Sequence, residues 1–247
     1  MLSETAPYVI GQSAFDPLAQ LWKNYLTIPE ALQQSFLQDN KVIQGVGFKM
    51  KHIHELVSTT GATHIKASFI IRPDKHGNMH FSVTLHAVDF LGTRLSSYYL
   101  PTYATTEHDL PVEAKGGTKK RYKNQLSNSL VNNWLTNWSD YGKGDAAYFA
   151  SPYGPLLAYT FEVSEFVAMF FRLHSQRVNS SWLELSFVLH AYWRSMPIEA
   201  PTHEEKVSTF GLVIRLKRPT PDDPNDLPGG GTGDDAILDM GKPSPPY

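Results

Sequence analysis

Apolar and polar residues alternate strictly in three stretches of the chain. Residues 80–87, 183–192 and 209–217 place an apolar side chain at almost every second position. Because successive side chains of a strand point to opposite faces, a period of two predicts strands with one buried and one polar face. Such strands are typical of antiparallel sheets, whose buried face we expect helices to cover. The pattern therefore predicts an α+β fold built on antiparallel sheet.

Other stretches repeat their apolar residues at helical spacing. They are residues 18–26, 29–36, 50–57, 126–138 and 166–171. At the first of them, Asp16 precedes Pro17, which predicts a helix that is capped by Asp16 and begins at the proline. These segments carry mainly packing residues, so we expect them to be structural.

The order helix–strand–strand occurs twice, over about 45–100 and 158–218. The first strand of each unit contains Ser-Phe, as Ser68-Phe69 and Ser186-Phe187. Two explanations stay open: duplication of one unit, or independent use of a common α+β unit. A helical connector over 101–157 joins the units, which predicts a single body spanning 1–218.

The last residues, 219–247, differ sharply in composition from this body. They are rich in proline, glycine and aspartate, which disfavour regular structure and predict a flexible acidic tail. Six aspartates oppose one lysine there, so the body is mildly basic while the whole chain has a net charge of −2. Within the tail, 234–240 combines apolar and acidic residues and is a candidate docking segment; a plain solvated tail is the alternative.

Several classes of chemistry are excluded by composition or lack a motif. The chain has no cysteine, which excludes disulfides, thiolate metal sites and cysteine nucleophiles. The N-terminus lacks the features of a secretory signal, and no apolar run is long enough to span a membrane. We therefore expect a cytoplasmic protein without membrane contact. The sequence indicates neither a cofactor nor a metal, and it contains no serine-nucleophile or phosphate-loop motif.

Polar side chains with chemical potential gather on the polar faces of the predicted strands. A small-ligand binder or an enzyme could use them if the strands were neighbours. Along one strand His80 and His86 lie about 20 Å apart, too far to hold one metal ion. The candidate ligand-binding residues are His80, His86, Glu184, His190, Ser68 and Ser186.

A second candidate surface is a basic turn. It could bind an anion, the acidic tail or, less readily, nucleic acid, because its positive charges are concentrated beside two glycines. Its residues are Lys115, Lys119, Lys120, Arg121 and Lys123.

Aromatic residues in predicted loops form the third candidate surface. Tyrosine and phenylalanine beside glycine and proline are common at protein interfaces, although they also close ordinary cores. The residues are Tyr98, Tyr99, Tyr103, Tyr148, Phe149 and Tyr153. With no catalytic pattern complete, we expect a non-catalytic interaction or assembly protein that binds a protein partner or itself; the enzyme or ligand-binding alternative stays open.

Overall fold

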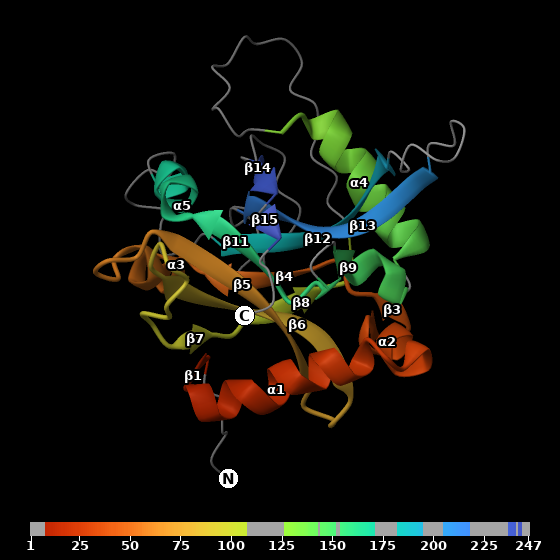
Figure 1. Ribbon diagram of the computed structural model, residues 1–247, viewed down its shortest axis with the longest axis horizontal. Coiled ribbons are helices and arrows are strands. Elements are labelled where there is room, and N and C mark those ends of the chain that lie inside the picture. The colour runs from red at the N-terminus through yellow and green to blue at the C-terminus, as the bar shows by residue number, and fades with distance from the viewer. Residues whose placement is uncertain are drawn as a thin grey trace, which may run out of the picture.

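The computed structural model describes residues 8–107, 126–142, 144–151, 154–170, 182–194, 205–217, 237–240 and 242–243. In this part of the chain, two larger antiparallel sheets face each other and helices lie against them (Figure 1). The predicted α+β class with antiparallel sheet is therefore confirmed.

Each of these sheets combines strands from distant parts of the sequence. The first sheet has the order β1 (Val9–Ile10), β7 (Tyr98–Tyr99), β6 (Met79–Val88), β5 (His64–Pro73), β11 (Ala158–Glu162) and β15 (Lys242–Pro243). The second has the order β14 (Ile237–Met240), β13 (Glu205–Lys217), β12 (Trp182–Arg194), β4 (Gly45–Lys49) and β8 (Tyr103–Thr105). Two short hairpins stand apart from them: β2 (Leu37–Gln38) with β3 (Lys41–Val42), and β9 (Ala150–Ser151) with β10 (Gly154–Pro155).

The helices agree in number and place with the apolar periodicity, except at the first boundary. They are α1 (Gln12–Tyr25), α2 (Pro29–Ser35), α3 (Met50–Val57), α4 (Asn128–Tyr141) and α5 (Val163–Phe170), with a 3₁₀ turn η1 at Ala146–Phe149. The predicted start at Asp16-Pro17 was wrong, because α1 already begins at Gln12 and Pro17 lies inside it. The additional turn is held by Phe15, whose ring stacks on Tyr98 with 3.8 Å between centroids.

The core lies between the two sheets. Phe81 of β6 packs on Phe187 of β12 with ring centroids 5.3 Å apart, and Phe69 of β5 packs on Phe210 of β13 at 5.5 Å. The apolar face of each sheet is thus covered largely by the other sheet. Helices α1 and α4 lie instead against the outer faces, where α4 buries Val131 and Leu135 on the second sheet. Although the alternating strands direct most of their apolar side chains into the core, some, such as Val188, point to the outer face, and α4 packs on them there.

The same sequence of elements runs twice through the described chain. The first run consists of helices α1 and α2, hairpin β2–β3, strand β4, helix α3 and strands β5 to β8. The second consists of helix α4, the 3₁₀ turn η1, hairpin β9–β10, strand β11, helix α5 and strands β12 to β15. In both runs the strand before the central helix joins the other run's sheet. Thus β11 pairs with β5, placing Ala158 opposite Ser68, and β4 pairs with β12, placing Gly45 opposite Ser186.

Aromatic residues at equivalent places in the two runs contact the other run. The indole of Trp22 in α1 donates a hydrogen bond to the Leu156 carbonyl at 3.1 Å, and that of Trp138 in α4 donates to the Ile43 carbonyl at 2.9 Å. Between them, the rings of Phe36 and Phe149 stack with centroids 5.6 Å apart. Each run therefore anchors a buried tryptophan on the backbone of the other.

Candidate functional site

The C-terminal strands β14 and β15 lie within the predicted tail. β14 pairs with β13, where Leu238 lies opposite Ile214, and β15 pairs with β11, where Pro243 lies opposite Tyr159. This short segment therefore adds one strand at an edge of each sheet. The candidate docking segment 234–240 is thus described in part, and its described part pairs with the body. The remainder of the predicted tail lies outside the described residues.

The predicted ligand-binding residues are divided between the two sheets. His80, His86 and Ser68 belong to β6 and β5 of the first sheet, whereas Glu184, Ser186 and His190 belong to β12 of the second. Their strand neighbours Phe81, Phe69 and Phe187 fill the core, so these polar side chains point outward on opposite sides of it. The structure does not bring the six into one pocket.

Two of these histidines lie beneath helices or aromatic rings, His86 buried and His190 half-buried. His86 is 5% exposed, with the Tyr98 ring at 4.7 Å. Burial, together with the charges of Lys66 and Arg94, lowers the pKa of His86 to about 3. Burial lowers the pKa of His190 to about 4, and its ring lies 5.5 Å from that of Trp134. Both histidines are therefore uncharged near neutral pH and act as packing residues.

Glu184 belongs to a buried polar cluster on the second sheet. The Ser186 hydroxyl donates to the Glu184 carboxylate at 2.6 Å, and the Arg215 guanidinium lies 3.6 Å from the same oxygen. Glu184 is 5% exposed and Arg215 1%. Because the Glu184 carboxylate already interacts with a hydroxyl and a guanidinium, we interpret it as a structural residue.

The predicted interface aromatics differ widely in exposure. Phe149 and Tyr98 are 1% and 4% exposed, so their rings fill the interior. Tyr99, Tyr103 and Tyr148 are partly buried, and Tyr153 lies outside the described residues. Sequence reasoning missed the neighbouring pair Phe90 and Leu91, which follow β6 and are each 75% exposed. The predicted basic turn with Lys115, Lys119, Lys120, Arg121 and Lys123 also lies outside the described residues.

A polar cleft opens where the β5–β6 hairpin faces the β2–β3 turn and the segment entering β8. We call it the hairpin cleft; it has a volume of about 500 Å³, within the range of small-molecule sites. Its lining includes Arg72 and His80, which lie directly opposite each other in the β5–β6 register. From the facing side come Asp39 of the turn and Thr102 before β8. His80 is thus the one predicted ligand-binding residue that lines this cleft.

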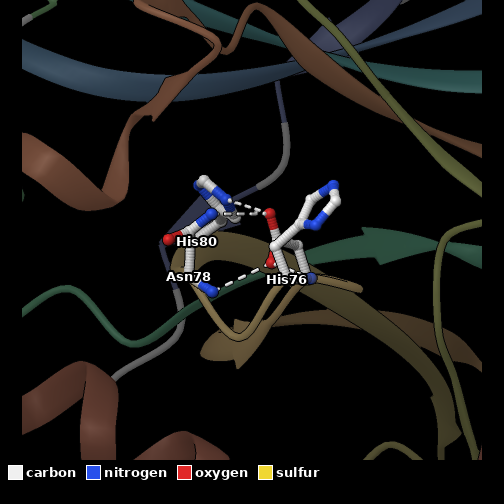
Figure 2. Close-up of polar contacts among 4 residues, drawn as sticks. His76, Asn78 and His80 are labelled. Atoms are coloured by element: carbon white, nitrogen blue, oxygen red, sulfur yellow. Dashed lines mark hydrogen bonds and ion pairs between the residues drawn. The ribbon is translucent and has the colours of Figure 1, made fainter.

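The hairpin loop is organised around one carboxylate. Figure 2 shows His76, Asn78 and His80 converging on it. Asp74 accepts hydrogen bonds from the backbone N–H groups of His76 and Asn78, at 2.7 and 2.9 Å, and from the side chains of Asn78 and His80, both at 3.2 Å. Although burial alone would raise it, these bonds hold the pKa of Asp74 well below its usual range. The loop therefore keeps an ionised Asp74 whose two oxygens are both occupied.

Three polar groups of the hairpin cleft, in Arg72, His80 and Thr102, lack such a partner among the described residues. Arg72 makes no hydrogen bond or ion pair with any residue that the structure describes, and burial lowers its pKa. Within the same part of the chain, Nδ1 of His80 and Oγ1 of Thr102 are buried without a hydrogen-bond partner. Sequence reasoning missed Arg72, Asp74 and Thr102. The available signal was the polar run Arg72-Pro73-Asp74-Lys75-His76-Gly77-Asn78, which precedes the alternating stretch 80–87.

Two further features are absent from the described residues. These residues contain no group of three or more histidine, aspartate or glutamate side chains placed to hold a metal ion. Nor do they include a helix that is long and apolar enough to cross a membrane. Comparisons with protein-family models, with curated proteins and with solved structures each found no match.

Proposed function

We propose that the protein is an intracellular, non-catalytic interaction or assembly protein whose C-terminal strands are its docking element. The observation that carries this proposal is the pairing of β14 with β13 and of β15 with β11. An edge strand presents backbone N–H and C=O groups that accept a further strand, and such strand addition is a common mode of protein recognition.

The length of the connection supports exchange of these strands between molecules. Residues 218–236 join β13 to β14, whereas residues 89–97 suffice to join β6 to β7 in the first run. A connection of the former length can reach roughly 60 Å when fully extended. The C-terminal strands of one copy can therefore reach the edges of another, and the partner that we propose is a second copy of this chain.

The repeated order of elements supports the same conclusion. We infer that the two runs are copies of one unit, in which β14 and β15 are the counterparts of β7 and β8. The matching pairs Trp22 and Trp138, Phe36 and Phe149, and Phe69 and Phe187 favour duplication over independent origin. The C-terminal strands then complete the second unit. They would pair with β13 and β11 in the same way whether they come from the same chain or from a second copy of it.

The proposal is tested by the mass of the protein in solution. Light scattering after gel filtration should give a multiple of 27.7 kDa for the full chain, and a variant without residues 219–247 should lose that association. A synthetic peptide of residues 234–247, added to the truncated variant, should bind to it because both sheet edges are then open.

The control uses two substitutions at one position of the peptide. Leu238→Pro removes a backbone donor from the strand and should abolish binding, whereas Leu238→Val keeps strand propensity and should preserve it. A strictly monomeric full chain, or a peptide whose binding ignores the proline, would overturn the proposed role of the C-terminal strands.

A further inference from the structure

We propose that the hairpin cleft binds a small molecule that carries an oxyanion, as a phosphate or carboxylate, next to a hydroxyl group. This site is separate from the C-terminal strands and does not depend on the function proposed above. The cleft is lined by groups that the fold itself leaves unused, and together they define what a ligand must supply.

Arg72 supplies the charge. It is partly buried at the wall of the cleft and has no ion pair among the described residues, so folding removes part of the water around a cation, and only the nearby Tyr8 offsets this loss. The nearby carboxylate of Asp74 does not compensate, because its oxygens accept from His76, Asn78 and His80. A planar guanidinium in this state matches the two oxygens of a carboxylate or phosphate.

His80 supplies a neighbouring acceptor. It lies opposite Arg72 in the β5–β6 register, and the side chains of such cross-strand pairs lie close together. Since the ionised Asp74 can only accept, the Nε2 of His80 must donate to it, which leaves Nδ1 of a neutral ring as an acceptor. Nδ1 is buried and has no partner among the described residues, so it is suited to a ligand hydroxyl.

Thr102 completes the arrangement from the opposite wall. Its hydroxyl can donate or accept, and it too is buried without a partner in the described part of the chain. Its backbone N–H is fixed by a 2.8 Å hydrogen bond to the Gly47 carbonyl, which holds the segment in place. The three groups thus approach the cleft from two independent elements.

The second run of elements shows that the fold does not require a cation at this register. His190 lies four residues after Ser186, as Arg72 does after Ser68, and its partner across the strands is Thr209. This histidine is half-buried, and the loss of solvent lowers its pKa to about 4, so it is uncharged near neutral pH. A charged arginine in the first run therefore has no structural counterpart, which favours a binding role for Arg72.

Binding can be tested with defined probes on the full chain. Glycerol 3-phosphate and citrate each carry an oxyanion beside a hydroxyl, whereas glycerol has the hydroxyls alone. In two-dimensional NMR titrations, at least one of the two anions should bind saturably at millimolar concentration and glycerol should not. The amide shifts should concentrate in residues 72–82 and 101–104.

Variants then assign the contacts. Arg72→Gln should weaken binding of the anion at least tenfold and Thr102→Val several-fold, whereas Lys51→Gln, which removes an exposed charge on α3 outside the cleft, should have no effect. If Arg72→Gln fails to fold, Thr102→Val carries the test. Absence of saturable binding by both anions, shifts centred outside the cleft, or equal binding by the cleft variants would overturn the proposal.

Discussion

Individual polar residues in this protein take their properties from how deeply the packing of the sheets and helices buries them. His80, His86 and His190 all lie on polar strand faces, but only His80 reaches the hairpin cleft. His86 and His190 lie beneath aromatic rings of α1 and α4, or of residues held by them, and lose their charge. The same residue type on the same kind of face thus lines a cleft in one place and packs beneath aromatic rings in another.

Burial of these two histidines predicts sensitivity to acid. Their pKa values, about 3 for His86 and about 4 for His190, lie below the value of about 6.5 expected in the unfolded chain. Between pH 6.5 and 4 the unfolded state binds protons that the folded state excludes, so stability falls as the pH is lowered. Each histidine should contribute a slope of up to about 1.4 kcal/mol per pH unit.

Urea unfolding between pH 7.5 and 4.5 measures this slope. His86→Gln and His190→Gln should each flatten the decline, whatever they cost in absolute stability. His76→Gln, at an exposed loop position, should leave it unchanged. If both buried-histidine variants retain the wild-type slope, another group controls the acid response.

At the scale of single elements, β4 depends on the absence of side chains at two positions. It lies between β12 and β8, and the Tyr103 ring crosses it to pack on Trp182 with centroids 5.2 Å apart. A Cβ atom at Gly47 would lie 2.0 Å from that ring, and one at Gly45 would lie 2.7 Å from the Leu185 carbonyl oxygen. A side chain at Gly45 would therefore meet backbone, and one at Gly47 would displace the Tyr103 ring from its contact with Trp182.

Gly47→Ala should consequently destabilise the protein by about 1–3 kcal/mol, as overpacked cores usually do. Gly11→Ala is a matched control, because the added methyl would meet nothing within 4 Å and the backbone φ of −86° suits alanine. Its effect should stay within about 0.5 kcal/mol. The free energies of unfolding of the two variants test this prediction, and equal values would contradict it.

The sequence could predict individual strands and helices, but not how the strands pair. Period-two alternation located β6, β12 and β13, and helical periodicity located α4, because both signals are local. The pairing of β4 with β12 and of β11 with β5 could not be predicted from a local pattern, because each pair joins residues far apart in the sequence. The hairpin cleft was missed for the same reason: Arg72 and Thr102 meet only after the sheets have packed.

At the scale of the whole molecule, the two runs of elements cannot be separated without breaking both sheets. The first sheet needs β11 from the second run, and the second sheet needs β4 and β8 from the first. Phe69 and Phe81 likewise reach their respective partners Phe210 and Phe187 only across the boundary between the runs. In the part of the chain that the structure describes, the two runs therefore share both sheets and one hydrophobic core.

A chain divided within residues 108–125 tests this interdependence. Neither fragment alone should give a folded monomer, because each would expose its core face, whereas the two fragments expressed together should form a complex of one copy each. Circular dichroism with thermal unfolding and light scattering measure both outcomes. A monomeric fragment that unfolds cooperatively by itself would contradict the prediction.

The stacking of Phe36 on Phe149 has a consequence for the history of the molecule. If the runs descend from one ancestral unit, these two rings were once the same residue in two identical chains, touching across a twofold axis. That ancestor could bury the apolar face of its sheet only as an obligate homodimer, in which each chain placed the strand equivalent to β4 and β11 in the sheet of the other. Fusion of two such genes would then free each half to change separately, so that one half could carry Arg72 where the other carries His190.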